Sequence, residues 1–307
     1  MSDNEFVPPA THLFGADDAF ALEVGTQTEL GQGVLAARME GCRIICGDAL
    51  AELRALPDAM FRCCVTSPPY WGLRDYGMPN QIGAEFKLED YVKNIRAVFR
   101  EVFRVLAPDG TLWLNIGDSY TSGGRTWRQE DKKNKGRGMD YRPPTPDGLK
   151  PKDLIGVPWR LAFGLQEDGW YLRSDVIWHK PNCQPESVRD RPTRSHEYVF
   201  LLTKSERYYY DWQAIREQAI GQGQKNRRTV WSINTEACPE AHFATMPTKL
   251  IEPCILAGSA AGDHVLDPFF GAGTVGLVSL RHSRKFTGIE INAEYAAMAR
   301  RRLGWSK

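Results

Sequence analysis

The amino-acid sequence predicts an α/β protein built on a largely parallel β-sheet. Three observations lead to this prediction. Short apolar runs alternate along the chain with segments of helical periodicity, which is the pattern of βαβ units. Several of the apolar runs end in an acidic residue or a Gly-Asp pair, as a strand does where it enters a loop. The composition, with 42% hydrophobic and 25% charged residues, is that of a globular protein.

Composition also excludes several classes of protein. The 307 residues carry a net charge of +1, so any attraction to nucleic acid or to an anionic membrane must be local. The chain has no run of 18 apolar residues, and we expect no membrane contact. Seven cysteines form no Cys-x-x-Cys pair. We interpret them as thiols of a reducing compartment and expect a cytoplasmic protein. His179, His196 and His242 lack the spacing of metal ligands, so no metal is expected.

The first half of the fold is predicted to begin at residue 43. Residues 43–46 and 61–65 are short apolar runs, and each is followed by residues that end a strand, Gly47-Asp48 and Pro68-Pro69. Residues 49–56 between them are predicted as a short helix. Residues 88–106 form the clearest helix, because apolar residues recur there at helical spacing, and Pro108-Asp109-Gly110 is expected to stop it. Residues 111–116 are the next predicted strand.

Regular structure is predicted to resume after residue 153. Apolar runs predict strands, and apolar residues at helical spacing predict helices. Residues 207–210 are predicted as the hairpin partner of the strand before them. The other strands are predicted at residues 171–178, 197–203, 264–267 and 285–289, and the helices at residues 158–166, 248–258, 273–280 and 293–303.

Three segments depart from this pattern. Residues 1–40 hold seven acidic residues and one basic residue, and we interpret them as an acidic, partly disordered extension that precedes a domain at 41–307. Residues 119–153 form an insert with nine basic residues. Loops of this length are uncommon in a compact domain unless they have a function. A solvated surface loop is the alternative to a nucleic-acid contact. Residues 221–244 are also predicted to be irregular.

One strand–turn–helix segment has the composition of a nucleotide-cofactor site. Asp267 ends an apolar strand, a glycine-rich turn containing Gly271 and Gly273 follows, and a helix begins. Glycines let the backbone approach a ligand, and a helix N-terminus offers free N–H groups. Glu290 ends the next strand, where an acid can accept the ribose hydroxyls of a nucleoside. With Gly276 the glycines also fit G-x-G-x-x-G, so a nicotinamide enzyme is an alternative.

A second loop follows the strand at 61–65. It reads Ser67-Pro68-Pro69-Tyr70, and its prolines make it rigid while removing N–H donors. Carbonyl groups and the Ser67 hydroxyl can therefore accept hydrogen bonds from an amino group, and the Tyr70 ring can stack on a planar base. A proline turn with a packed aromatic residue is the alternative.

Together the two loops resemble the motifs of the beta-class (permuted) DNA amino-methyltransferases, which modify cytosine N4 or adenine N6. Thr66 to Trp71 is similar to the family's catalytic motif, and Asp267 to Thr274 to its cofactor motif. The likeness covers roughly residues 41–303. Other segments agree in order: Cys46-Gly47-Asp48, the run from Leu112 to Asp118, Trp178-His179-Lys180-Pro181, His196-Glu197, and Gly288 to Asn292.

The resemblance implies a Rossmann-like fold with a mostly parallel seven-stranded sheet and helices on both faces. It implies S-adenosylmethionine as the cofactor and double-stranded DNA as the partner, in a protein of bacterial, phage or archaeal type. A cognate restriction endonuclease and a homodimer stay open. The implied catalytic residues are Ser67, Pro68, Pro69 and Tyr70. The implied cofactor residues are Asp267, Pro268, Phe269, Gly271, Gly273 and Thr274 around the methionine part, Glu290 at the ribose, Asp48 at the adenine edge, and Asn292.

The implied reaction is site-specific transfer of a methyl group to the exocyclic amino nitrogen of a flipped base. The family's adenine enzymes mostly carry Asp where this chain has Ser67, so the resemblance favours cytosine over adenine. Methylation of the cytosine ring carbon needs a cysteine nucleophile. Pro253-Cys254 lies inside a predicted amphipathic helix, and we interpret Cys254 as a core residue.

DNA contacts are predicted in two regions, the basic insert at 119–153 and a short target-recognition region at 211–245. The alternatives are an RNA or protein-side-chain methyltransferase, a nicotinamide oxidoreductase, which would not explain Ser67 to Trp71, and a catalytically inactive DNA-binding module. The predicted DNA-binding residues are Arg125, Arg128, Lys132, Lys133, Lys135, Arg137, Lys225, Arg227 and Arg228.

Overall fold

The computed structural model describes residues 39–73, 78, 81–122, 142–221, 223–236 and 245–305. The chain divides into two units, Met1–Ala37 and Arg38–Lys307, and the described residues belong to the second. The predicted acidic extension therefore lies outside the described residues except for its last two positions. Of the predicted basic insert, residues 119–122 and 142–153 are described.

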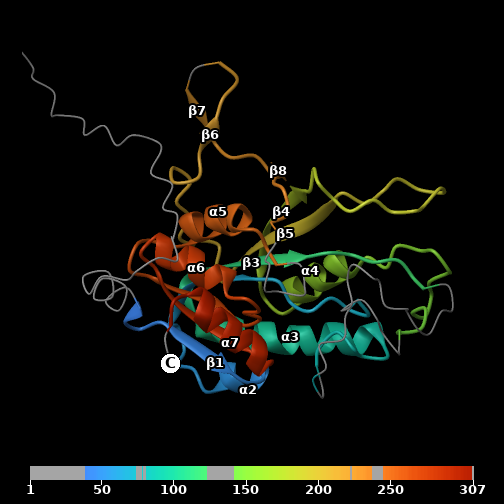
Figure 1. Cartoon of the computed structure of the whole chain (residues 1–307), viewed down its shortest axis with the longest axis horizontal. Helices are drawn as coiled ribbons and strands as arrows, with labels where there is room; N and C mark the ends of the chain where they lie inside the picture. The colour runs from blue at the N-terminus through green and yellow to red at the C-terminus, as the bar shows by residue number, and fades with distance from the viewer. Residues whose placement is uncertain are drawn as a thin grey trace, which may run out of the picture. The chain divides into compact units, whose positions relative to one another are not determined.

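A single large sheet forms the centre of the domain (Figure 1). Its neighbouring strands pair in parallel, except that β5 runs antiparallel to both of its neighbours. This confirms the predicted α/β class with a mostly parallel sheet. Eight described strands belong to it, in the order β1 (Arg43–Cys46), β10 (Lys285–Glu290), β9 (His264–Asp267), β2 (Phe61–Thr66), β3 (Leu106–Ile116), β5 (His196–Thr203), β4 (Tyr171–His179) and β8 (Val230–Ser232).

Helices cover both faces of this sheet, as predicted. On β3, Leu112, Leu114 and Ile116 face a core cluster supplied by the first set of helices. Trp113, which alternates with them, lies against Gly258 of the second set, because successive side chains of a strand point to opposite faces. The first set is α2 (Ala49–Arg54), α3 (Leu88–Val105) and α4 (Val157–Glu167), and the second is α5 (Thr248–Gly258), α6 (Thr274–Arg281) and α7 (Ala293–Arg302).

The end of α3 differs from the prediction. The helix stops at Val105 and β3 begins at Leu106, so the residues expected to separate helix from strand lie inside the strand. The register explains how a proline is tolerated there. Phe61 pairs with Leu106 and Cys63 pairs with Thr111, so residues 107–110 form an irregularity without partners in β2. The missing N–H of Pro108 therefore costs no hydrogen bond between these strands.

Two further expectations about strands were wrong. Residues 207–210 form no strand, because they return toward β3, where the Tyr209 N–H donates to the Asp109 carbonyl at 3.0 Å. The segment at 221–244, expected to be irregular, contains β8, which pairs with β4 and adds an eighth strand to the seven predicted. It also holds β7 (Gln224–Lys225), which pairs with β6 (Glu217–Gln218) as a separate two-stranded ribbon. No helix in the described part of the chain is long and apolar enough to cross a membrane.

Candidate active site

The predicted site residues meet at one edge of the sheet. Strands β1, β10, β9 and β2 are consecutive and parallel, so Asp48, Glu290, Asp267 and Ser67 all lie at their carboxyl ends. Hydrogen bonds join the loops directly. The Thr66 hydroxyl donates to Asp267 Oδ1 at 2.7 Å, and the Gly47 N–H donates to the Glu290 carbonyl at 3.0 Å. This edge is where open α/β sheets bind ligands.

The predicted cofactor loop, residues 267–274, and the elements beside it need glycine for two different reasons. Gly271 and Gly273 have φ of 51° and 78°, a left-handed conformation that favours glycine. A Cβ at Gly288 would lie 2.2 Å from the Phe270 ring, and one at Gly276 would lie 2.7 Å from it. Gly276, the third glycine of the predicted pattern, is therefore required by packing against Phe270.

The Glu290 side chain connects the loop after β9 with the turn that follows its own strand. Its Oε2 accepts from the Gly271 N–H at 2.7 Å, and its Oε1 accepts from the Asn292 N–H at 2.9 Å. Burial raises the pKa of this carboxyl, and the backbone donors oppose that rise. The Asn292 side chain caps α7 by accepting from the Glu294 N–H at 2.8 Å. Each carboxylate oxygen keeps a second lone pair with which to accept a ribose hydroxyl.

Asp267 is only 2% exposed. Burial raises its pKa to about 7, although hydrogen bonds from the Thr66 hydroxyl and the Phe269 N–H lower it, and the nearby Glu290 raises it further. A carboxyl group in this setting charges readily once a cation is placed beside it. Thr66 directly precedes the loop Ser67-Pro68-Pro69-Tyr70 (the proline loop). The same hydrogen bond therefore connects the cofactor loop with the proline loop.

Other predicted cofactor residues have structural contacts of their own. Asp48 Oδ1 accepts from the Ala51 N–H at 2.9 Å and so caps α2. Phe269, which follows Pro268, packs against the core cluster. Thr274 Oγ1 accepts from Arg302 at 2.8 Å, and the same Arg302 nitrogen donates to the Ala272 carbonyl at 3.1 Å. Arg302 fastens the cofactor loop to α7. It was missed because one arginine on an amphipathic helix gives no sequence signal.

A side chain of helix α3 fixes the backbone of the proline loop. The Pro69 carbonyl accepts from the Tyr91 hydroxyl of α3 at 2.9 Å. A Cβ at Gly117 would lie 2.8 Å from Tyr70 Cε2, so the Tyr70 ring packs directly over the backbone at the end of β3. Within the described residues, the Pro68 carbonyl accepts no hydrogen bond from another protein group, which leaves it available to a substrate amino group.

Three residues that sequence reasoning left out of the site complete it. Tyr70 Oη donates to Glu197 Oε2 at 2.9 Å and contacts Asn115 Oδ1 at 3.3 Å. Asn115 Nδ2 also donates to Glu197 Oε2, at 3.2 Å. Lys180 forms an ion pair with Glu197 Oε1. A signal did exist, because Asn115 interrupts a buried apolar strand and Glu197 lies near the start of another.

The predicted DNA-binding residues divide into two groups. Arg125, Arg128, Lys132, Lys133, Lys135 and Arg137 lie outside the described residues. The other three lie in or after the β6–β7 ribbon. Lys225 and Arg228 both pair with Glu217, at 3.5 and 3.2 Å, and Arg227 lies 4.5 Å from the centre of the Trp231 ring. The structure brings none of these three into the hydrogen-bonded site at the strand ends.

Cys254 is 1% exposed and lies inside α5. Burial raises the pKa of its thiol, which disfavours the thiolate that a nucleophile requires. The structure therefore agrees with the interpretation of Cys254 as a core residue. Among the described residues, no group of three or more His, Cys, Asp and Glu side chains is placed to hold a metal ion.

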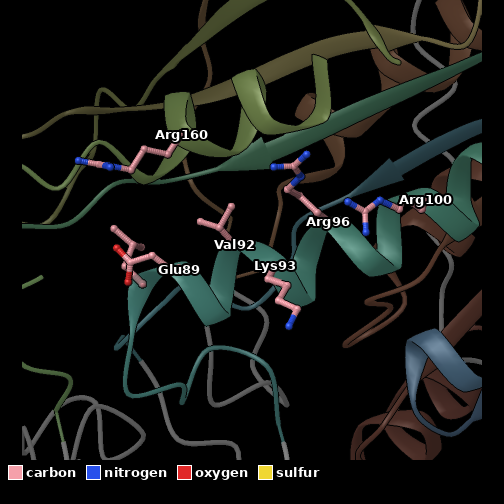
Figure 2. Close-up of a pocket in the computed structure, with 7 residues that line it drawn as sticks. Glu89, Val92, Lys93, Arg96, Arg100 and Arg160 are labelled. Carbon is pink, nitrogen blue, oxygen red and sulfur yellow. The ribbon is translucent and has the colours of Figure 1, made fainter. Parts of the chain in front are cut away.

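A cavity of about 340 Å³ lies on the helical layer formed by α3 and α4 (Figure 2). Four basic side chains surround it, and two of them, Arg96 and Arg100, bind the same carboxylate, Asp168. No predicted catalytic or cofactor residue lines the cavity. Its lining residues are Leu88, Glu89, Val92, Lys93, Arg96, Arg100 and Arg160.

Comparisons with known proteins establish the family. A family model described as DNA methylase (N6_N4_Mtase) matches residues 61–301. The type II methyltransferase M.SmaI of Serratia marcescens is 61% identical over 284 residues, which are 92% of this chain and 96% of that protein. The type II methyltransferase M.Cfr9I of Citrobacter freundii is 61% identical over 265 residues, 86% of this chain and 88% of that protein. The chain therefore belongs to the DNA methylase family and is a DNA methyltransferase of the N6/N4 class.

Solved structures share the fold. The PvuII DNA methyltransferase, described as cytosine-N4-specific, matches with a TM-score of 0.64 and 21% identity, covering 86% of each chain. A putative DNA modification methylase from Thermus thermophilus, complexed with S-adenosyl-L-methionine, matches with a TM-score of 0.59 and 24% identity, covering 86% of this chain and 93% of that one. These likenesses confirm the predicted methyltransferase fold.

Proposed function

We propose that the protein transfers a methyl group from S-adenosylmethionine to the exocyclic amino nitrogen of cytosine at a specific site in double-stranded DNA. The observation that carries this proposal is the position of Ser67. Ser67 directly follows β2, whose last residue, Thr66, donates a hydrogen bond to Asp267. This hydrogen bond joins the loop that bears Ser67 to the cofactor loop. Ser67 stands where the adenine enzymes of the family mostly carry Asp, and this difference supports the choice of cytosine.

The residues at the cofactor loop fit S-adenosylmethionine. The N-terminus of α6 has no side-chain cap, because Gly273 is its N-cap, so its N–H groups are available to a ligand. The position where Gly271 would carry a Cβ faces open space. We assign Gly271, Gly273 and Asp267 to the methionine part and Glu290 to the ribose hydroxyls. When bound, the cofactor supplies an electrophilic methyl group on a positively charged sulfur.

The chain's own residues prepare the nucleophile. An exocyclic amino nitrogen is a weak nucleophile because its lone pair is delocalised into the base. Ser67 Oγ and the Pro68 carbonyl each accept a hydrogen bond from one of the two amino hydrogens. These hydrogen bonds favour a pyramidal nitrogen whose lone pair points toward the cofactor. Positioning of this kind supplies much of the acceleration in transfer reactions. Stacking on Tyr70 offsets part of the cost of removing the base from the duplex, a few kcal/mol.

The product tests the base assignment. We expect nucleoside mass spectrometry of DNA methylated by the purified protein to show N4-methylcytosine. 5-Methylcytosine should be absent, and Cys254→Ser should stay active, because no cysteine nucleophile takes part. If N6-methyladenine is the only modified base, the assignment to cytosine is wrong while the enzyme class stands.

DNA binding is proposed for the β6–β7 ribbon and for the basic residues between 125 and 137. The ribbon extends away from the sheet, beyond α5 (Figure 1). Its turn carries Ile220, which is 99% exposed, and its stem carries Lys225 and Arg228. A two-stranded ribbon fits the major groove, and basic residues at its base can contact phosphates.

Pairing with a restriction endonuclease and dimerisation stay predictions from the resemblance.

Removal of the charges on this stem should weaken DNA binding. We expect Lys225→Ala with Arg228→Ala to flatten the log–log salt dependence of binding by about two units, one for each phosphate that is no longer neutralised. Thermal stability should change little, because both side chains pair with Glu217 at the surface. The double variant Arg54→Ala with Lys93→Ala removes equal charge from α2 and α3 and should keep the wild-type slope. Equal slopes for both double variants would exclude the ribbon from DNA binding.

A further inference from the structure

A continuous line of polar side chains leads from the proline loop to Glu197. The Ser67 hydroxyl donates to Tyr70 Oη at 3.4 Å, and the Tyr70 hydroxyl donates to Glu197 Oε2 at 2.9 Å. We propose that Ser67, Tyr70 and Glu197 form a proton path, and that Glu197 is the base that receives the proton released when the amino group is methylated. This inference rests on the proposed function of Ser67 as the acceptor of an amino hydrogen.

The geometry around Glu197 favours a proton acceptor. Its side chain is 18% exposed, so it lies largely inside the protein but can pass a proton to water. Lys180 and Asn115 contact its two oxygens, and these contacts hold the carboxylate in place beside Tyr70. A Cβ at Gly117 would lie 3.2 Å from Glu197 Cγ and 2.8 Å from the Tyr70 ring. Glycine there lets the carboxylate and the ring meet.

The reaction requires such an acceptor. The amino nitrogen forms a bond to the methyl carbon while the bond from that carbon to sulfur breaks, and the electron pair leaves on sulfur. The nitrogen then carries the positive charge and must lose one hydrogen. That proton passes to Ser67 Oγ as Ser67 gives its own proton to Tyr70 Oη and Tyr70 gives its proton to Glu197 Oε2. The positive charge of the methyl donor and the negative charge of Glu197 thereby cancel.

The length of the first hydrogen bond is consistent with this path. Hydrogen bonds used in catalysis are often long before the substrate binds and shorten in the reacting complex. The second bond, to Glu197, already has a normal length of 2.9 Å. Tyr70 thus has two separable parts, a ring that stacks on the base and a hydroxyl that carries the proton.

Three variants separate proton transfer from positioning. Glu197→Gln keeps the shape and an acceptor for Tyr70 but cannot take a proton, and Tyr70→Phe keeps the ring but breaks the path. For both we expect the single-turnover rate of methyl transfer to fall about 10²-fold, a typical contribution of general base catalysis. In Glu197→Ala we expect added formate to restore the rate in proportion to its concentration, because a small carboxylate can enter the partly exposed space left by the side chain.

Further measurements make the test decisive. DNA affinity, and the fluorescence of 2-aminopurine at the target position as a readout of base flipping, should match the wild type in all three variants. Glu252→Gln, the same change at an exposed carboxylate on α5, should keep full activity. A rate for Glu197→Gln within twofold of the wild type, an absence of formate rescue, or a loss of base flipping would each overturn the proton path. The base assignment is read from the wild-type product, so the two failures are distinguishable.

Discussion

The Glu290→Ala variant is expected to bind S-adenosylmethionine at least about 100-fold more weakly than the wild type, because two charge-assisted hydrogen bonds to the ribose hydroxyls are worth about 1.5 kcal/mol each. The structure adds a second reason. The same carboxylate accepts from the Gly271 and Asn292 N–H groups, so its removal also releases the loop that would hold the methionine part.

Isothermal titration calorimetry with S-adenosylmethionine measures this effect directly, and thermal unfolding followed by circular dichroism shows whether the fold survives. Glu294→Ala is the matched control. It removes an exposed carboxylate four residues later, in the first turn of α7, and should keep wild-type affinity. Wild-type affinity in Glu290→Ala would remove Glu290 from the cofactor site.

The Asp267→Asn variant is expected to be more stable than the wild type at pH 8 and to lose cofactor affinity. The folded-state pKa of Asp267 is raised from 3.8 to about 7, so the folded protein binds more protons than the unfolded chain between these values. Stability from this group is therefore highest below about pH 4 and falls as the pH rises toward 7. A shift of roughly three units corresponds to at most about 4 kcal/mol, which a neutral asparagine avoids.

Urea denaturation at pH 5 and pH 8 tests this expectation. The gain in stability of Asp267→Asn over the wild type should be larger at pH 8, whereas its affinity for the cationic cofactor should fall because the carboxylate is lost. Asp168→Asn is the contrasting control. Hydrogen bonds from Arg96 lower the pKa of Asp168, so its charge stabilises the fold above about pH 4 and its loss should destabilise the protein at pH 8. A gain for Asp267→Asn that is equal at both pH values would contradict the raised pKa.

Local features of the sequence were sufficient for most of the elements and for the two loops. A strand followed by Pro68-Pro69 must end there, and a strand followed by Gly271 and Gly273 must turn there, because these residues restrict or extend the backbone conformations available at their own positions. The spacing of apolar residues that predicts strands and helices is also a local property, because it depends only on residues close together in the sequence. The carboxyl ends of β9, β10 and β2 lie at one edge because these neighbouring strands are parallel.

Other features depend on the order of the strands, which no local pattern contains. β5 lies between β3 and β4, and this order brings Glu197 to Tyr70 across 127 residues of sequence. The contact of Arg302 with the cofactor loop and the pairing of β8 with β4 also depend on long-range packing. The sequence by itself determined which residues the proline and cofactor loops contain. Only the tertiary structure decided which buried polar side chains join them, because a polar group inside a sheet must find its partner on whichever strand becomes its neighbour.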